Sequence, residues 1–595
     1  MGPMHSIDRR VFLSSLAGSL FTASAQTRPV SKPAPLATAL DANACWLDVA
    51  APFVVVDPAL QLSTDILLTA TCFPGVEGYK DSRYATEYQV LLYDSSGKEI
   101  RLENNGRLEI PSLRPTLLQM QQWAGAAGTF FGGARIRVAP SPHQMPHAGD
   151  LFSVGFVRWN LPSNFDNVHA HPAPPQQVYG YFNYSMPFPA LSEYHCAFAL
   201  FNPNDEESSG IVRVVDRMGR TARERRYLLP PHQTTLYTMS DLKTASTPGE
   251  AMAVTPLNEP KLADGGVIVV RNESPKASFG YTIMRGREGG SFTLDHPLHF
   301  AADAPMLPAR PSPYGPKGNF PAQAMLLTPM VFQGFRVRDL QLETRHYLSS
   351  SRWQEEALWM LPMVTTGEGR VAWASNHDDR LAARVRPAAL TVNGVIRLAE
   401  FQSCRIDTRD LPLPEGFAGG FGVATLPKTS HSLQKLEVRA TNWGRSAITH
   451  FRPGGASAKA YRQADTRGGL ASDYIVSGAH LIGSPARPHR DCLLAIMNIE
   501  LEADQNGAPR LQLFGPSGLV GETQLPEFPP LACRHLVLSD LFPGVQSDPE
   551  HPFTVRMTVP NAIMIVSALH IDWDRRDLAL EHGSDRHSTY ADFKC

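Results

Sequence analysis

The amino-acid sequence predicts an all-β protein built from antiparallel β-sandwiches in tandem. Two observations carry this prediction: a strand–turn–strand unit recurs along the chain, and residues that form turns are abundant. The 595 residues include 50 prolines and 45 glycines, above the average share of about 12% for these two residues together. Frequent turns shorten the elements between them, which favours strands over long helices.

The repeated unit is clearest at two places in the chain. In each, a short apolar run leads into a glycine-containing turn, then into Pro-Pro, and finally into Ser-Asp-Leu. The first proline and the aspartate are Pro230 and Asp241 in one copy, and Pro529 and Asp540 in the other, with the same spacing. A repeated supersecondary unit indicates a repeated fold.

Looser copies of the unit fill much of the remaining chain, at the strand spacing of immunoglobulin-like sandwiches. We therefore expect about four immunoglobulin-like domains behind a signal peptide. The expected boundaries are a signal peptide at 1–25, a leader at 26–44, sandwiches at 45–172 and 173–300, a proline-rich linker at 301–324, and sandwiches at 325–455 and 456–595. The linker carries six prolines, and such a segment cannot join a sheet, so it is expected to separate two halves.

Paired arginines precede an uncharged, moderately apolar run near the amino terminus. Arg9 and Arg10 are followed by Phe12 and Leu13, and the run ends in small residues at 23–25. This pattern resembles a twin-arginine export signal. The resemblance implies transport by the twin-arginine translocase and a periplasmic or secreted protein; a general secretory signal or a short buried helix is the alternative. The run is shorter than the ~20 residues that a membrane span needs, so no transmembrane span is expected.

Charge and motifs argue against several classes of function. The formal net charge is −2, so the chain lacks the basic character of a nucleic-acid-binding protein. The sequence contains no phosphate-binding loop, no His-Glu-x-x-His and no Gly-x-Ser-x-Gly, which are the patterns of common catalytic sites. No catalytic residue and no bound cofactor are therefore predicted from motifs.

Histidines gather where the expected sandwiches end, close to acidic residues. They are His169, His171, His296, His299, His582 and His587. Two histidines that are two positions apart on a strand share a face, and with a carboxylate they could hold Zn or Cu. The alternative is that they are polar residues at the solvated ends of domains.

Two tyrosines alternate along an expected strand at the start of the second sandwich. Tyr179 and Tyr181 would share one strand face. An exposed tyrosine face can stack on sugar rings or on a partner surface. Burial within the core of the domain is the simpler interpretation, because most aromatic side chains are buried.

Seven cysteines in an oxidising compartment would favour disulfide bonds. The repeat places Cys492 and Cys533 in two strands of the same copy. If both side chains point inward, a bond between them could join the two sheets and stabilise the domain by up to about 4 kcal/mol. The competing interpretation is a pair of buried free thiols, and a Cα separation above about 7 Å would exclude the bond.

The leading functional interpretation is an exported, non-catalytic protein that binds or scaffolds a protein or glycan of the cell envelope. One alternative is a metal-dependent enzyme that uses the histidines at the domain ends. Another is a carbohydrate-binding protein that uses the tyrosine face.

Overall fold

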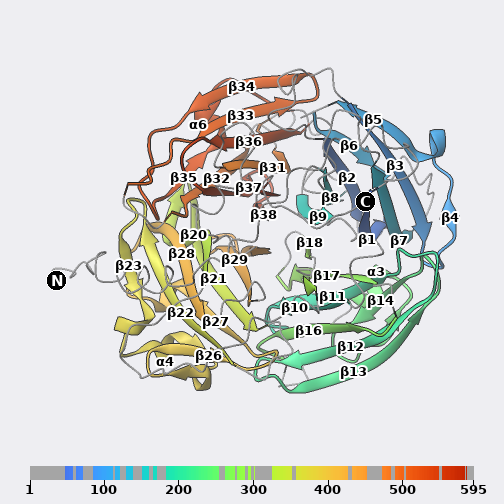
Figure 1. The fold of residues 1–595 in the computed structure, drawn as a ribbon, viewed down its shortest axis with the longest axis horizontal. Helices are drawn as coiled ribbons and strands as arrows, with labels where there is room; N and C mark the ends of the chain where they lie inside the picture. Colours follow the sequence, from blue (N-terminus) through green and yellow to red (C-terminus); the bar gives the residue numbers. More distant parts are fainter. Residues whose placement is uncertain are drawn as a thin grey trace, which may run out of the picture.

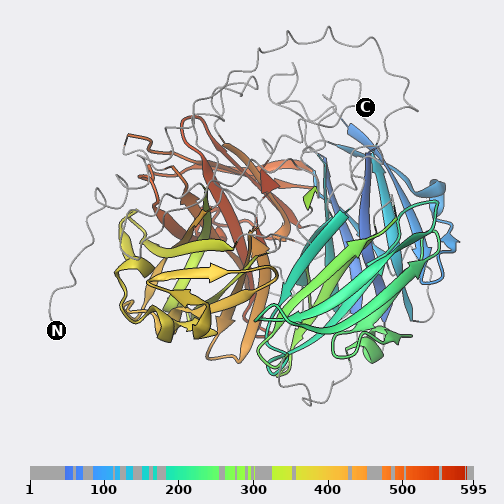
Figure 2. The same ribbon diagram turned by 60° about the horizontal axis from the view of Figure 1, so that its bottom comes forward.

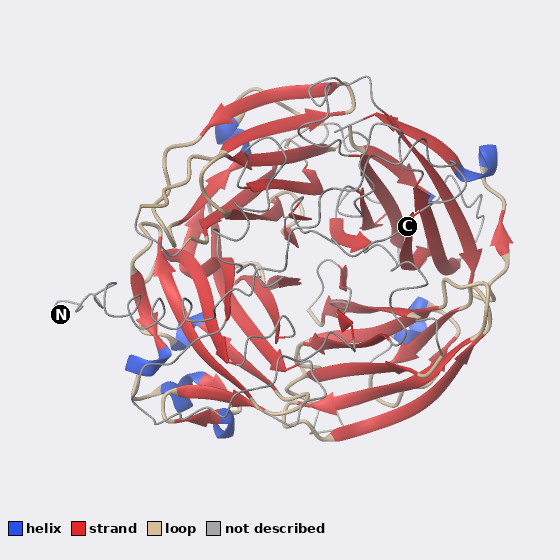
Figure 3. Ribbon diagram, viewed as in Figure 1, coloured by secondary structure: helices blue, strands red, loops and turns tan. Residues whose placement is uncertain are grey.

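The computed structural model describes most of residues 47–585. The described ranges are 47–57, 62–70, 85–111, 114–120, 129–138, 151–159, 165–170, 182–252, 262–274, 278–288, 292–295, 300–301, 324–350, 357–426, 432–451, 472–480, 482–483, 489–500, 504–547, 552–582 and 584–585. Strands dominate these ranges, and the helices are single turns such as α3 (Pro248–Ala251), α4 (Leu381–Arg384) and α6 (Leu538–Leu541) (Figure 3). The prediction of an all-β fold is confirmed.

The strands fall into four groups along the chain, which we call units 1 to 4. The number of immunoglobulin-like domains and their boundaries stay predictions. Unit 1 contains β1 (Leu47–Asp57), β2 (Leu62–Ala70), β3 (Ala85–Asp94), β4 (Glu99–Ile100), β5 (Arg107–Pro111), β6 (Thr116–Gln119), β7 (Phe130–Val138), β8 (Leu151–Trp159) and β9 (Phe165–Ala170). Unit 2 contains β10 (Phe182–Phe188), β11 (Tyr194–Phe201), β12 (Ser208–Asp216), β13 (Thr221–Leu229), β14 (Thr234–Thr238), β15 (Thr244–Ala245), β16 (Gly266–Asn272), β17 (Phe279–Gly286), β18 (Phe292–Asp295) and β19 (Phe300–Ala301).

The second half of the chain repeats this organisation. Unit 3 contains β20 (Ala324–Val337), β21 (Leu340–Ser350), β22 (Leu358–Thr366), β23 (Val371–Ala374), β24 (Val385–Arg386), β25 (Thr391–Val392), β26 (Val395–Leu398), β27 (Ser403–Asp407), β28 (Phe417–Leu426), β29 (Ser432–Ala440) and β30 (Arg445–Phe451). Unit 4 contains β31 (Ser472–His480), β32 (Arg490–Asn498), β33 (Arg510–Gly515), β34 (Gly518–Gln524), β35 (Cys533–Val537), β36 (Phe553–Val559), β37 (Met564–Asp572), β38 (Asp577–His582) and β39 (Ser584–Asp585).

Units 2 and 4 are each two sheets with a common core and the same strand order. In unit 2 the sheets run β13-β12-β16-β10-β19 and β15-β14-β11-β17-β18, and in unit 4 they run β34-β33-β36-β31-β39 and β35-β32-β37-β38. The register also agrees, because Phe198 pairs with Tyr237 and Leu494 pairs with Leu536. The Pro-Pro turns agree as well: the next residues, His232 and Leu531, have φ values of 60° and 62°.

Units 1 and 3 are each one extended sheet, and they also share a register. In unit 1 the sheet runs β4-β3-β7-β1-β2-β8-β9. Its part β2-β1-β7-β3 corresponds to the order β21-β20-β28-β22 in unit 3. The last hairpin of unit 1 pairs Val154 with His169, and the last hairpin of unit 3 pairs Lys435 with His450. The two halves of the chain are therefore internal repeats of one another.

The four units lie around a common centre and close into a ring (Figures 1 and 2). Each unit contacts the next through strands, namely β1 with β11, β10 with β29, and β20 with β32; unit 4 returns to unit 1 through β31 and β2. Apolar side chains of neighbouring units fill the seams. Leu436 and Leu569, for example, belong to one buried cluster shared by units 3 and 4.

The seams within the two halves are built alike. In unit 1, Gly97 (φ 90°) lies against the carbonyl oxygen of Pro231, and in unit 3, Gly369 (φ 76°) lies against the carbonyl oxygen of Pro530. A Cβ atom at either glycine would collide with that oxygen. The Pro-Pro turn is thus a docking surface for a glycine turn of the preceding unit.

The seams between the halves form a second matching pair. Gly219, in the β12–β13 turn of unit 2, lies beside Gln402 of unit 3, and Gly518, in the β33–β34 turn of unit 4, lies beside Arg114 of unit 1. In the first of these seams, the backbone N–H of Ser403 donates a hydrogen bond of 3.1 Å to the carbonyl oxygen of Arg217. The ring therefore has two kinds of seam, and each kind occurs twice.

Within the described part of the chain, no helix has the length and apolar character that crossing a membrane requires. The export residues Arg9, Arg10, Phe12 and Leu13 lie outside the described residues.

The tight fit of Gly369 predicts a specific cost for adding a methyl group. We expect Gly369→Ala to lower the free energy of unfolding by about 1–3 kcal/mol more than Gly416→Ala, because of overpacking at the seam. Gly416 is the matched control, since its φ of 80° imposes the same backbone strain while nothing lies within 4 Å of its added Cβ. Urea unfolding measures both variants, and equal losses would contradict the docking of the two turns.

A buried charged network between units 2 and 3

Arg345 stands in the middle of β21 with a carboxylate directly opposite on each neighbouring strand. The register pairs Arg345 with Asp407 on β27 and with Glu437 on β29. Directly opposed residues on antiparallel strands have Cβ atoms about 5 Å apart, so opposite charges in such a row attract. The strand alignment alone therefore assembles an acid–arginine–acid row.

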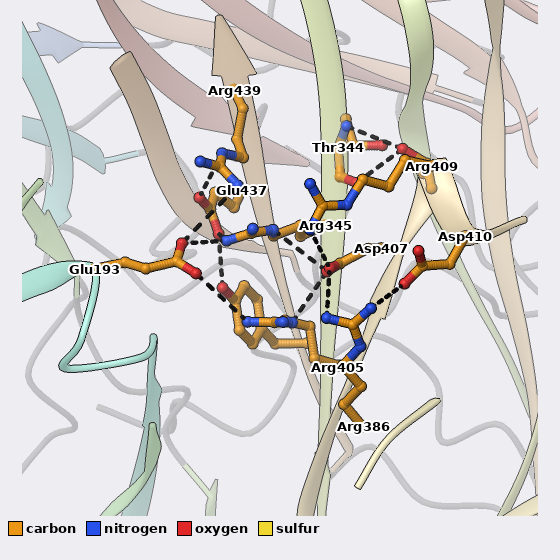
Figure 4. A network of polar contacts seen from close by, with 12 residues as sticks. Glu193, Thr344, Arg345, Arg386, Arg405, Asp407, Arg409, Asp410, Glu437 and Arg439 are labelled. Carbon is orange, nitrogen blue, oxygen red and sulfur yellow. Dashed lines mark hydrogen bonds and ion pairs between the residues drawn. The ribbon is translucent and has the colours of Figure 1, made fainter. Parts of the chain in front are cut away.

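The side chains make the contacts that the register sets up (Figure 4). The Arg345 guanidinium lies 3.3 Å from the Asp407 carboxylate and 3.6 Å from the Glu437 carboxylate. It also donates a hydrogen bond to Glu193 of unit 2, so the row extends across the seam. The side chain of Arg345 is 5% exposed, and those of Asp407 and Glu437 are each 1% exposed.

Further arginines surround these carboxylates. Asp407 has Arg405 at 3.0 Å, Arg386 at 3.6 Å and Arg409 at 3.7 Å, while Glu437 has Arg439 at 3.7 Å. Arg439 and Arg405 also approach Glu193, at 3.9 and 4.0 Å. Arg386 makes its closest ion pair with Asp410, at 2.6 Å. Positive and negative charges therefore nearly balance, as a buried network requires.

Two tyrosines complete the coordination of Glu437. Tyr194 of unit 2 donates to one carboxylate oxygen at 2.8 Å, and Tyr347 donates to the other at 2.6 Å. Tyr194 also shares a hydrogen bond with Ser446 on β30. Both oxygens of Glu437 thus accept from hydroxyl groups, and one of these hydroxyl groups belongs to the neighbouring unit.

Burial and neighbouring charges shift the pKa values of Arg345, Glu193 and Tyr194. Burial alone would lower the pKa of Arg345, but Glu437, Tyr347 and Asp407 hold it above its ordinary value. Burial alone would raise the pKa of Glu193, but its hydrogen bond to Arg345 and the nearby arginine charges lower it. Burial together with the Glu437 charge raises the pKa of Tyr194. The arginine and Glu193 stay charged, and the tyrosine stays a neutral donor.

The network belongs to only one of the two equivalent seams. In unit 1, the row that corresponds to Asp407–Arg345–Glu437 consists of Gln119, Asp65 and Phe156. That row carries a single charge, so it cannot form an acid–arginine–acid arrangement. The charged network thus distinguishes the seam between units 2 and 3 from the seam between units 4 and 1.

Most of the site residues expected from the sequence cannot be placed. His171, His296, His299, His587, Tyr179 and Tyr181 lie outside the described residues. The backbone positions of His169 and His582 are described, in β9 and β38. Among the side chains that the structure describes, no three His, Cys, Asp or Glu residues form a group that could hold a metal ion.

The structure corrects the expected disulfide between Cys492 and Cys533. Both thiols are free and buried, and the Cys533 thiol donates to the carbonyl oxygen of Pro329 at 2.9 Å. The two cysteines lie on adjacent strands of one sheet rather than on facing sheets, with Cys533 paired to Met497. Met497 is five residues from Cys492 along β32, or about 16 Å at ~3.3 Å per residue, far beyond the reach of a disulfide.

Sequence reasoning missed the charged network entirely. Glu193 and Arg345 are 152 positions apart, and a single charged residue in a strand usually indicates a solvent-facing position. There was no local signal in the sequence either, because the strands of Arg345, Asp407 and Glu437 carry other polar or charged residues. In β29, Lys435, Glu437 and Arg439 alternate with apolar residues, which is the pattern of a strand with one solvent-facing side.

Comparison with known proteins adds no family assignment. No model of a known protein family matches this chain, and no curated protein is significantly similar to it.

Removing the central arginine should destabilise the protein strongly. We expect Arg345→Met to lower the free energy of unfolding by about 3–5 kcal/mol, because Asp407 and Glu437 would keep buried charges without their shared partner. Arg213→Met is the control: its ion pair with Glu224 has side chains 28% and 45% exposed, so its loss should cost less than about 1 kcal/mol. Denaturant unfolding measures both, and similar losses would contradict a stabilising role for the row.

A partly buried histidine at the seam between units 3 and 4 should make stability depend on pH. The His535 Nε2–H donates to the Pro329 carbonyl oxygen at 2.9 Å, and the imidazole ring packs against Phe332. Burial lowers the pKa of His535 to about 4. Between pH ~6.5 and ~4, the unfolded chain therefore takes up a proton that the folded protein does not, so stability falls as the pH falls through this window.

The expected result is a flatter pH dependence of stability in His535→Gln, because glutamine can donate the same hydrogen bond without titrating. His346 and His570, whose pKa values burial lowers to about 3, remain in both proteins and cancel in the comparison. Unfolding at pH 4.5 and 6.5 measures the difference, with His377→Gln, at an exposed turn position, as control. An unchanged pH dependence in His535→Gln would show that this imidazole is not held neutral.

Proposed function

We propose that this protein is an exported, non-catalytic scaffold that binds a protein or glycan of the cell envelope. The observation that carries the proposal is the charged network between units 2 and 3. Glu193 and Glu437 are engaged across the seam by Arg345 and Tyr194, and Asp407 is engaged by arginines of unit 3. These charges therefore join the two units and are not available to a substrate.

The other reactive side chains of the described residues support the same interpretation. Burial raises the pKa of Cys196 and of Cys404 to about 12, and a thiol in that state is a poor nucleophile. Burial lowers the pKa of His570 to about 3, whereas a general base works best with a pKa near the operating pH. These shifts reduce reactivity, which is opposite to the tuning that catalytic sites need.

The shape of the ring supports scaffolding. Each of the four units contacts two neighbours, so their outer surfaces keep fixed relative positions. A rigid arrangement lowers the entropy cost of binding a partner at several points. The export part of the proposal rests on the resemblance of residues 8–25 to a twin-arginine signal.

The test combines turnover and location of the full-length protein. We expect no turnover above buffer on panels of ester, phosphate, glycoside and redox substrates, and the same result for a variant with alanine at His296, His299, His582 and His587. In fractionated cells, the mature protein should be in the envelope fraction, whereas replacement of Arg9 and Arg10 by lysine should keep the precursor in the cytoplasm.

Two results would overturn the proposal. One is an activity that the quadruple histidine variant loses while its melting temperature stays that of wild type, which would favour the metal-dependent enzyme. The other is normal export of the double lysine variant, which would remove the basis for an envelope location. Binding to a glycan array that is lost on changing Tyr179 and Tyr181 to alanine would narrow the partner to a carbohydrate.

A further inference from the structure

Beside the row that contains Arg345, unit 3 carries a second row in which the only charges are positive. Tyr347 stands two residues beyond Arg345 on β21, so both side chains lie on the face that packs on unit 2. The register pairs Tyr347 with Arg405 on β27 and with Lys435 on β29. Arg405 is 8% exposed and Lys435 is 1% exposed. Two buried cations therefore flank one tyrosine.

The equivalent row in the other half of the chain carries no charge. In unit 1, Leu67 has the register position of Tyr347, and it pairs with Leu117 on β6 and with Val154 on β8. The same repeated sheet is therefore built there from apolar residues. Because a cation is costly to bury without an anion, the cations of unit 3 require a reason other than the fold that the two units share.

Unit 2 places a third cation against this row. Arg217, in the β12–β13 turn, lies over the ring of Tyr347, with its Cζ atom 5.3 Å from the ring centroid. The carbonyl oxygen of Arg217 accepts from the backbone N–H of Ser403, two residues before Arg405 on β27. Arg217 is 6% exposed. The matching turn of unit 4, residues 515–518, has no charged residue, so this group of cations belongs to the seam between units 2 and 3.

The Arg217 guanidinium keeps a buried donor without an acceptor. Its Nε donates to the carbonyl oxygen of Asp264, and the face of the Tyr347 ring attracts its positive charge. Its Nη2 is buried and has no hydrogen-bond partner in the described part of the chain. Burial lowers the pKa of Arg217, and the nearby Arg405 charge adds to this effect. An unsatisfied buried donor costs free energy, so an anion that accepts from Nη2 would stabilise the seam.

Arg405 offers further donors at the same place. Its Nε lies 3.0 Å from the Asp407 carboxylate, whereas its Nη1 is 4.0 Å from Glu193, beyond hydrogen-bond length (Figure 4). The side chain of Glu193 is 35% exposed. Solvent therefore reaches this end of the row, and a small ligand has a route to it.

We infer that a phosphate group binds at the seam between units 2 and 3, between the guanidinium groups of Arg217 and Arg405. Guanidinium groups present paired N–H donors that match phosphate oxygens, and a phosphate has enough oxygens for both arginines. Its charge of about −1.5 to −2 offsets the buried cations, including Lys435 on the other side of Tyr347. The ligand thereby joins two units, and the inference does not depend on the proposed scaffolding role.

The test is binding of inorganic phosphate by the full-length protein. Wild type is dialysed into phosphate-free buffer and titrated with sodium phosphate by calorimetry, and its melting temperature is followed at an ionic strength held constant with NaCl. We expect a saturating rise in melting temperature, because phosphate binds the folded chain, and no rise with sodium acetate. Binding of glycerol 3-phosphate as well would assign the site to a phosphate group on a larger molecule, and binding of inorganic phosphate alone would assign it to the free ion.

Arg217 variants connect the binding to this seam. Arg217→Gln should weaken phosphate binding at least about tenfold, since hydrogen bonds to charged groups are the stronger ones. Arg226→Gln is the control, because Arg226 lies in the same unit with its side chain 72% exposed, and it should bind as wild type does. Arg217→Lys keeps the charge without the paired donors and should bind with intermediate affinity.

Melting temperatures of all variants are measured first without phosphate, so that loss of the fold is separated from loss of the site. If Arg217→Gln does not fold, Arg217→Lys takes its place in the comparison. Wild-type affinity in the folded Arg217 variants would overturn the inference. A wild-type melting temperature that responds to phosphate no more than to acetate or NaCl would overturn it as well.

Discussion

The arrangement of the units depends on one row of charges, Asp407–Arg345–Glu437, and on its extension to Glu193 across the seam. Charges in such a place are expensive to bury, and a well-packed apolar row would be at least as stable. What the charged row provides is specificity in the choice of the neighbouring unit. The chain is an internal repeat, so the surface of unit 3 that receives unit 2 is similar in construction to the surface of unit 1 that receives unit 4.

The two incoming units differ at the positions that meet this row. Unit 2 brings Glu193 and Tyr194, an acid and a hydroxyl donor, whereas the equivalent register positions of unit 4 are His489 and Arg490. A unit 4 in the place of unit 2 would bring neither the acid that Arg345 contacts nor the hydroxyl group that Glu437 accepts from, because Arg490 pairs within its own unit with Asp572, at 2.8 Å. The wrong order of units, within one chain or between two chains, is therefore disfavoured by the loss of these contacts to the charged row.

The sequence predicts the features that are set by local backbone geometry and not those that are set by long-range packing. The Pro-Pro turn could be matched between Pro230 and Pro529 because proline fixes φ and the turn needs a left-handed residue after it, here His232 and Leu531. Register confirms that Cys196 and Cys492 occupy matching positions. The sequence does not indicate which sheet is joined by the strand after the Pro-Pro turn, which is β14 in unit 2 and β35 in unit 4. The expected disulfide assumed that β35 lies in the sheet facing β32, whereas the two strands are neighbours in one sheet.

The ring also explains how the central strands can carry polar residues. Thr293 on β18 and Thr449 on β30 are buried, and both strands lie where strands of the four units contact one another. An exposed edge strand is open to pairing with other chains, and closure of the ring covers four such edges at once. Because each unit is held by two neighbours, opening one seam leaves its two surfaces close together. The seam then closes again as an intramolecular event at high effective concentration. The charged row therefore selects the correct neighbour and joins units 2 and 3, while the apolar seams and the contacts at the centre add to the hold on all four units.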